Sequence, residues 1–241
     1  LATQRVTVHW VEDAPLRQSS LRSLGGFHNA TANEIFMDEL AALAGADPVA
    51  FRLRHLDDPR AIAVIEEAAR VAGWDARTAT EQSGGGLRGR GIAFARYETA
   101  FTYVATVVEV EVEPASGVVR VPRVVVAHDC GAVINPDGVT NQIEGNVIQG
   151  LSRALLEEVR WDRHGVTSLT YADYPILTFP DVPRITVSLL DRPEAPPWGA
   201  GEPTICTVPA AVSNAIFDAT GVRLRMVPYT PARVRAALRG A

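Results

Sequence analysis

Hydrophobic and polar residues alternate along several short stretches of the 241-residue chain. A period of two is typical of β-strands with one buried face. The pattern predicts strands, in chain order, over residues 5–11, 91–97, 104–113, 118–128 and 184–190, and a further hairpin over 159–169. Because Pro-Ala-Ser-Gly at 114–117 is a turn sequence, the strands on either side of it should form a hairpin.

Other stretches repeat their hydrophobic residues every three or four positions, which predicts helices. These helices cover residues 31–44, 47–55, 59–72, 139–157, 209–220 and 231–238. Asp47 followed by Pro48 is typical of a helix start. Gly45, Gly73 and Gly221 each follow a predicted helix end, where glycine readily adopts the left-handed closing conformation.

The order of these elements predicts an α+β fold in which antiparallel hairpins pack on helices. We expect a helical block over 1–77, with an Arg-Gly-Gly loop inside an irregular segment at 16–29. A glycine-rich linker is expected over 78–89, followed by an α+β portion over 90–241. A chain of this length can bury a real core, as one large domain or two modest ones.

Composition narrows the classes of function. Hydrophobic residues make up 47% of the chain and charged residues 21%, as in ordinary globular proteins. The 23 Lys and Arg against 28 Asp and Glu are scattered, so no nucleic-acid partner is expected. No hydrophobic run approaches the roughly 18 residues of a membrane span. Cys130 and Cys206 make no disulfide framework, and no Cys/His cluster has metal-ligand spacing, so we expect no metal ligands from the protein.

The predicted helix at 139–157 carries a polar stripe beside its hydrophobic one. Gln142, Asn146, Gln149 and Arg153 follow steps of three and four, which places them on one face together with Gly145. Carboxamides beside glycines suit a large polar ligand, because glycine allows close approach and the amides donate and accept hydrogen bonds. A polar helix face in water has the same spacing, and spacing alone leaves that alternative open.

Two loops carry candidate charged groups. Glu202 lies in Gly-Ala-Gly-Glu-Pro at 199–203, before the helix predicted from 209, whose positive end favours an ionised carboxylate ready to accept a proton. Arg22 lies in Leu-Arg-Ser-Leu-Gly-Gly at 21–26, where a guanidinium beside exposed backbone amides suits an anionic or oxo ligand. An exposed loop glutamate and an arginine in a solvated turn remain the alternatives.

Together these motifs resemble the large subunits of the molybdenum hydroxylases, the xanthine dehydrogenase and aldehyde oxidase family. The resemblance rests on the segments 22–26 with Glu34 and 38–41, 129–137, 142–145, 149–151 and 201–203, which occur in the family's order. The match as a whole covers almost the entire chain. Residues 48–56 and 203–225 look like the isoquinoline 1-oxidoreductase β-subunit type. The family's Gly-Gly-Phe-Gly-type and Gly-Gln-Gly segments are absent from this chain, and in that branch they lie upstream.

The resemblance implies a molybdopterin-binding-domain-like fold that is incomplete without an upstream half. The chain begins at Leu1 without a signal peptide, so we expect either a shortened chain or the tail of a longer polypeptide. By the same resemblance Glu202 is the catalytic base that deprotonates a molybdenum-bound hydroxide. Gln149 would bind the pterin, Leu21 and Arg22 would line the metal site, and Gly201 would belong to the cofactor-binding loop.

The implied activity is that of an oxidoreductase that hydroxylates an N-heterocycle or oxidises an aldehyde with oxygen derived from water. The implied cofactor is molybdenum-molybdopterin, either as such or in its cytosine dinucleotide form, with the metal held by the pterin dithiolene. Iron–sulfur clusters would lie on a partner chain that accepts the electrons, and the upstream half would be part of the same or a separate chain. Relatives occur in both cytoplasm and periplasm. A non-catalytic subunit that docks such a partner is the alternative function.

Overall fold

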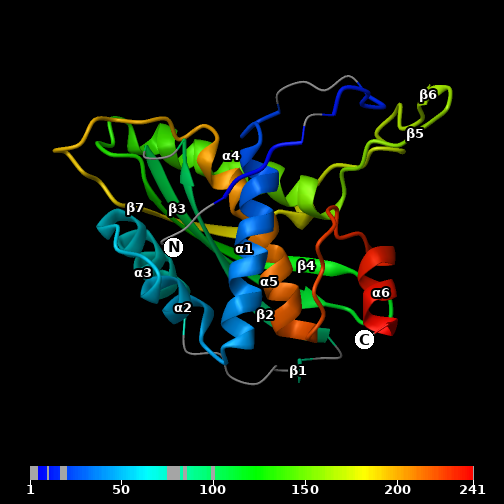
Figure 1. The fold of residues 1–241 in the computed structure, drawn as a ribbon, viewed down its shortest axis with the longest axis horizontal. Coiled ribbons are helices and arrows are strands. Elements are labelled where there is room, and N and C mark those ends of the chain that lie inside the picture. Colours follow the sequence, from blue (N-terminus) through cyan, green and yellow to red (C-terminus); the bar gives the residue numbers. More distant parts are fainter. Residues whose placement is uncertain are drawn as a thin grey trace.

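The computed structural model describes residues 5–9, 11–16, 21–74, 82–83, 86–98 and 101–240. Its helices are α1 (Gly26–Leu43), α2 (Pro48–Arg54), α3 (Pro59–Ala72), α4 (Pro136–Leu155), α5 (Val208–Thr220) and α6 (Pro231–Arg239), with short 3-10 helices η1 (Phe179–Asp181) and η2 (Pro203–Cys206) (Figure 1). Its strands are β1 (Gln82–Ser83), β2 (Gly86–Tyr97), β3 (Thr102–Val112), β4 (Val119–Asp129), β5 (Trp161–Asp162), β6 (Gly165–Val166) and β7 (Arg184–Leu189).

The main sheet has the strand order β1-β2-β3-β4-β7. Strands β2, β3 and β4 form consecutive antiparallel pairs, so the predicted hairpin around residues 114–117 is confirmed. Strand β7 pairs with β4 in parallel, from Arg123 opposite Arg184 to His128 opposite Leu189. A parallel pair needs a long crossover, and α4 with the small β5–β6 hairpin supplies it. The predicted α+β fold is confirmed, with one parallel strand added to the antiparallel hairpins.

Helices cover both faces of this sheet. Alternate β3 residues divide between two hydrophobic clusters, with Val104 and Val108 on one side and Ala105 and Val107 on the other. The first cluster includes residues of α4 and α5, and the second includes residues of α3. The alternation of hydrophobic and polar residues predicted a strand with one buried face. Strand β3 is instead buried on both faces, because helices form a layer on each side of the sheet.

The helix boundaries follow the predicted capping residues. The Asp47 side chain accepts hydrogen bonds from two backbone N–H groups at the start of α2, and Asp58 does the same for α3. Gly73 and Gly221 close α3 and α5 in the left-handed conformation, with φ of 67° and 76°. Local sequence is sufficient for these ends because each cap satisfies backbone groups only a few residues away.

Three local predictions differ from the structure. The strand expected over 5–11 is wrong for the residues described there, because 5–9 and 11 form no strand and all are exposed. Helix α1 begins at Gly26 rather than at 31, so the irregular segment ends earlier than expected. Residues 86–89 of the expected linker belong to β2, where residues 87–89 pair with β3; residues 75–81 and 84–85 lie outside the described residues.

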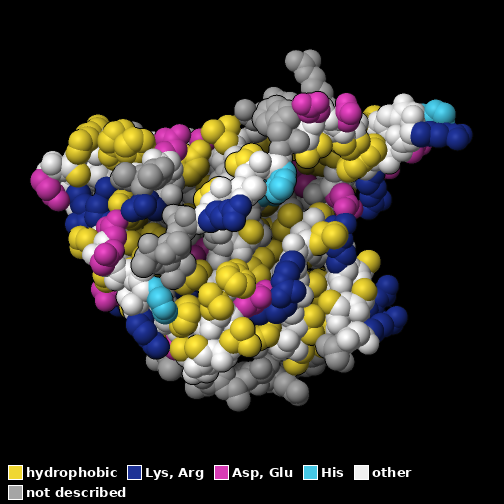
Figure 2. Space-filling model, viewed as in Figure 1, with side chains coloured by type: hydrophobic (Ala, Val, Ile, Leu, Met, Phe, Trp, Pro, Cys, Tyr) yellow, Lys and Arg dark blue, Asp and Glu magenta, His cyan; other side chains and the backbone are white. Residues whose placement is uncertain are grey.

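Helix α1 buries two charged residues and leaves two large hydrophobic residues exposed. Glu34 and Asp38 are buried and lie close to Arg52 of α2. On the outer side Phe36 is 58% exposed and Leu43 is 84% exposed. Figure 2 shows hydrophobic side chains gathered over the middle of this face, where α1 lies in Figure 1. In the described part of the chain no helix combines the length and hydrophobicity that crossing a membrane requires.

Candidate functional site

The carboxylate of Glu202 lies between two donors from distant segments. The residue follows a loop of Gly199, Ala200 and Gly201 and directly precedes η2. Its Oε1 accepts a hydrogen bond from the backbone N–H of Ser23 at 3.1 Å. Its Oε2 accepts one from the hydroxyl of Tyr97 at 2.6 Å. Glu202 is half-buried, so this glutamate is held by the fold and is not an ordinary exposed loop residue.

Arg22 joins the Glu202 loop to α4. Its Nε donates to the carbonyl oxygen of Gly201, the residue before Glu202. One terminal nitrogen donates to Gln149 Oε1 at 3.2 Å and the other to Gln142 Oε1 at 2.8 Å. Burial lowers the pKa of Arg22, while the negative charge of Glu202 opposes that shift. The planar guanidinium thus reaches two elements at once, a geometry that an ammonium group cannot reproduce.

The backbone of the Arg22 loop has an unusual conformation. Ser23 and Leu24 have φ of 79° and 50°, in the left-handed region that residues other than glycine rarely adopt. This conformation accompanies the turn bond from the Leu24 N–H to the Leu21 carbonyl, at 2.9 Å, while the Ser23 N–H meets Glu202. Residues in such conformations cost of order 1–3 kcal/mol and cluster at functional sites. The Leu21 side chain is 62% exposed beside this turn.

The polar stripe of α4 faces these two loops. Asn146 is fully buried, and its Nδ2 donates to the carbonyl of Gly201 at 3.1 Å. Its Oδ1 accepts from the N–H of Ile205 at 3.3 Å, so one carboxamide holds both ends of the Glu202 segment. Arg153 donates to the Arg22 carbonyl at 3.2 Å and its guanidinium carbon lies 3.9 Å from the centre of the Phe27 ring. The stripe is therefore bound to protein groups and is not simply a solvated helix face.

The geometry leaves room for a large polar ligand. A Cβ placed on Gly199 would meet nothing within 4 Å, and one on Gly145 would meet only the Arg22 guanidinium, at 3.6 Å. Backbone and polar side chains are thus open to close approach here, beside the carboxamides and the guanidinium. Among the described residues, no group of three or more His, Cys, Asp or Glu could hold a metal ion.

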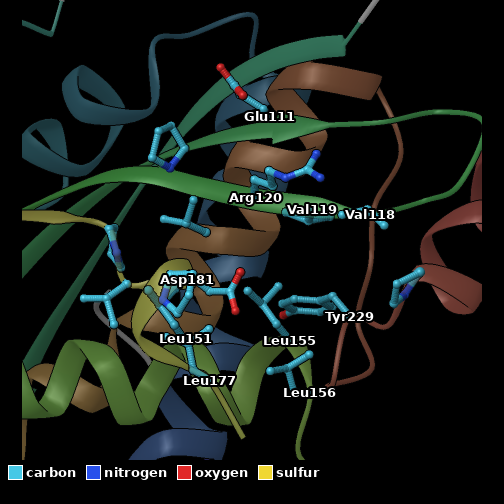
Figure 3. A pocket seen from close by; sticks show the side chains of 16 residues that line it. Glu111, Val118, Val119, Arg120, Leu151, Leu155, Leu156, Leu177, Asp181 and Tyr229 are labelled. Carbon is cyan, nitrogen blue, oxygen red and sulfur yellow. The ribbon is translucent and has the colours of Figure 1, made fainter. Parts of the chain in front are cut away.

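The structure contains two further pockets, one beside this cluster and one away from it. A pocket of about 500 Å³ next to Glu202 has Ser23, Gly26, Tyr97 and Cys206 among its lining residues. Another, of about 440 Å³, lies where the end of α4 meets the start of β4, and its lining residues include Leu151, Leu155, Leu177 and Tyr229 (Figure 3). None of the residues that bond Glu202 or Arg22 lines this second pocket.

The structure brings the predicted site residues together. Arg22 bonds both Gly201 and Gln149, Glu202 lies beside the same turn, and Leu21 is its exposed first residue. Two partners of Glu202 were not predicted as such from the sequence, the hydroxyl of Tyr97 and the backbone N–H of Ser23. Gln142 and Asn146 did have one, because both belong to the polar stripe, but their separate partners come from the tertiary fold.

Comparison with known proteins identifies the family to which this chain belongs. Residues 32–183 match the family described as Molybdopterin cofactor-binding domain. The chain is 46% identical to a nicotinate dehydrogenase subunit of Pseudomonas putida over 98% of its length, which is 21% of that protein. It is 37% identical to the β-subunit of isoquinoline 1-oxidoreductase of Brevundimonas diminuta over 88% of its length, which is 26% of that protein.

A solved structure shares the fold. The aldehyde oxidoreductase of Desulfovibrio gigas superposes with a TM-score of 0.76 over 91% of this chain and 42% of that one, at 16% identity. A likeness at this level of sequence identity shows a shared fold and nothing about function. The chain spans about a quarter or less of the two curated relatives that it matches.

Proposed function

We propose a catalytic role for this chain on the premise that it belongs to the molybdopterin cofactor-binding domain family of the molybdenum hydroxylase large subunits. In the assembled enzyme, Glu202 would act as the base, and Arg22, Gln149 and the Gly201 loop would bind the pterin cofactor. One observation supports this assignment above the others. A carboxylate, a guanidinium and a carboxamide from segments up to 179 residues apart converge beside open glycine backbone.

Molybdopterin, or its cytosine dinucleotide form, fits the donors and acceptors of this site. When bound, the molybdenum–pterin group supplies a centre that accepts two electrons from the substrate, while water supplies the new oxygen atom. The three bonded partners of the Arg22 side chain named above are carbonyl oxygens, so its positive charge stays available to an anionic or oxo group. Gln149 is exposed and bonded to Arg22, which orients its carboxamide toward the same space.

The role of Glu202 is to receive a proton. Each carboxylate oxygen accepts one hydrogen bond within the protein, from Ser23 or from Tyr97. A carboxylate oxygen has two lone pairs, so one remains on each atom for a proton from the water-derived hydroxyl group. A positioned general base contributes roughly 10²–10⁴-fold in rate. Asn146 and Arg22 both hold the Gly201 carbonyl and thereby fix the backbone that carries the carboxylate.

For the substrate we propose an electron-poor carbon of an N-heterocycle. This choice is supported by the names of the two relatives above, which refer to nicotinate and isoquinoline. An aldehyde is the second substrate class to be assayed, because the same proton transfer serves oxygen insertion at a carbonyl carbon. We further propose that an upstream half of the large subunit, in the same or a separate chain, completes the cofactor site, and that an iron–sulfur protein removes the electrons.

Replacing Glu202 by Gln in the assembled enzyme tests the catalytic role. The change keeps the size of the side chain but removes the basic carboxylate and replaces one of its two acceptor oxygens by an NH2 donor. Turnover of an N-heterocycle should fall roughly 10²–10⁴-fold, while molybdenum content per chain stays unchanged. Glu194→Gln, at an exposed position of the preceding loop, is the matched control and should keep full turnover.

The docking alternative makes the opposite prediction. If the Glu202→Gln enzyme retains turnover within about tenfold of the parent at equal molybdenum content, the carboxylate is not the base. The chain would then serve mainly to hold its partner.

A further inference from the structure

We propose that Tyr97 is a positioning residue that holds the carboxylate of Glu202 in a single orientation. Tyr97 is the last residue of β2, and its hydroxyl donates to Glu202 Oε2 at 2.6 Å. This inference rests on the proposed function, in which Glu202 is the base. It adds a residue from a third segment, 105 positions away in the sequence, whose role would be to act through Glu202.

Two hydrogen-bond donors from different segments of the chain hold the carboxylate of Glu202. The backbone N–H of Ser23 occupies Oε1 and the hydroxyl of Tyr97 occupies Oε2, so each oxygen has a fixed partner. Rotation of the carboxylate about its final bond would break both hydrogen bonds at once. A base held in this manner keeps its free lone pairs in constant directions, and orientation is a main determinant of proton-transfer efficiency.

The ring of Tyr97 is itself fixed by close packing. A Cβ on Gly26 would lie 3.3 Å from the ring and 2.8 Å from the sulfur of Cys206, so only glycine leaves space at this point. The ring also packs against a small buried cluster of Phe27, Ile205 and Cys206. At its backbone, Tyr97 pairs with Thr102 at the end of the β2–β3 ladder. The hydroxyl therefore has a defined position before any ligand binds.

The environment of Tyr97 keeps its hydroxyl protonated, so that it donates the hydrogen bond to Glu202. Burial raises the pKa of Tyr97, and its bond to Glu202 raises it further, so the phenol stays protonated at neutral pH. The other charged or titratable groups around the pair are Arg22, which faces Glu202, and Glu98, which faces Tyr97. Cys206 faces both, and Arg153 faces Cys206. Burial raises the pKa of the Cys206 thiol to about 11, so it stays neutral.

Hydrogen bonds to charged groups are the stronger class, so losing the Tyr97 hydroxyl should free one end of the carboxylate to change its orientation. The substrate does not need to touch Tyr97 for this effect, so kcat should change more than KM.

The test is Tyr97→Phe in the assembled molybdenum enzyme, which deletes one oxygen atom. We expect kcat to fall about tenfold with KM within about twofold. The control is Tyr174→Phe, because Tyr174 donates to Glu157 at 2.7 Å in a similar half-buried Tyr–Glu pair. That variant should keep the parent's kcat and KM.

A second readout does not depend on turnover. Infrared spectroscopy follows the carboxylate stretching bands that are present in the parent and missing in Glu202→Gln. In Tyr97→Phe these bands should change in frequency, because one hydrogen bond to the carboxylate is lost. Molybdenum content per chain should match the parent, because the change leaves Arg22 and Gln149 intact.

The outcomes separate this inference from the proposed function. If Glu202→Gln abolishes turnover but Tyr97→Phe changes neither kcat nor the infrared bands of Glu202, Glu202 remains the base and the positioning role of Tyr97 is overturned. If Glu202→Gln retains turnover, the proposed function itself fails. A fall in kcat for Tyr97→Phe no larger than that for Tyr174→Phe also overturns the inference.

Discussion

Arg22 donates a hydrogen bond from Nε to the carbonyl oxygen of Gly201, the residue that precedes Glu202. The same guanidinium bonds the carboxamides of Gln142 and Gln149 on α4. One planar group thus fixes the distance between the loop that carries the proposed base and the helix that carries the proposed cofactor ligands. The loop of the proposed base and the proposed cofactor ligands are therefore connected through Arg22.

Replacing Arg22 by Lys should weaken cofactor binding while the fold survives. A lysine keeps the charge but cannot bond Gly201, Gln142 and Gln149 together, because its ammonium lacks the planar fork. Molybdenum content per chain, measured by mass spectrometry on the purified complex, should fall several-fold. Arg88→Lys is the control, since Arg88 forms an exposed ion pair with Glu111. Equal molybdenum content in the two variants would contradict a binding role for Arg22.

Removing the carboxamide of Asn146 should displace the Glu202 loop. Asn146→Ala leaves the Ile205 N–H without the partner seen here and removes a donor from the Gly201 carbonyl. We expect a loss of about 2 kcal/mol in the free energy of unfolding and a fall of at least about tenfold in kcat. Asn141→Ala, on the exposed side of α4, provides the comparison in denaturant titration and kinetic assays. Matching results for both variants would mean that Asn146 does not hold the loop.

A side chain at Gly91 should disrupt the contact between β2 and α5. A Cβ there would lie 2.3 Å from the Ala211 carbonyl oxygen and 2.3 Å from the Ala215 nitrogen, which are backbone atoms that cannot move aside alone. Gly91→Ala should therefore lower the free energy of unfolding by about 3 kcal/mol or more. Gly240→Ala, whose nearest neighbour would be 3.8 Å away, should leave it unchanged. Thermal unfolding of both variants decides the question, and a Tm for Gly91→Ala close to that of the parent would count against this packing.

The buried His128 should make stability depend on pH. Burial lowers the pKa of His128 to about 4, against an ordinary value of 6.5, so the folded state keeps this imidazole neutral. Between about pH 6.5 and pH 4 the unfolded chain binds the proton more readily, and stability is lost as pH falls through that window. The loss from this group should be about 2 kcal/mol between pH 7 and pH 4.5.

Urea unfolding at those two pH values measures this effect. His128→Leu removes the titrating group, so its free energy of unfolding should decrease less on acidification than that of the parent. His164→Leu, at an exposed position, should retain the parent's full dependence. A decrease in His128→Leu as large as in the parent would show that other groups cause the acid sensitivity.

Several features of this protein are encoded locally, and the sequence alone predicts them. Asp47 caps α2, Gly73 and Gly221 end their helices, and the turn at 114–117 joins β3 to β4, because each depends on backbone groups a few residues away. The motif around Glu202 and the polar stripe of α4 were also visible in the sequence. Their order along the chain indicated the molybdenum hydroxylase family.

Other features depend on contacts between distant residues. The start of α1 at Gly26 reflects its packing against Cys206 and Tyr97, and the alternating stretch from residue 5 forms no strand in its described part, where every residue is exposed. No local pattern marked Tyr97 or the Ser23 N–H as partners of Glu202, because those bonds join residues 105 and 179 positions apart. Local sequence determines where elements begin and end, since short-range hydrogen bonds decide that. Only the tertiary structure decided which side chains share the site, because burial and approach across the fold set those partners.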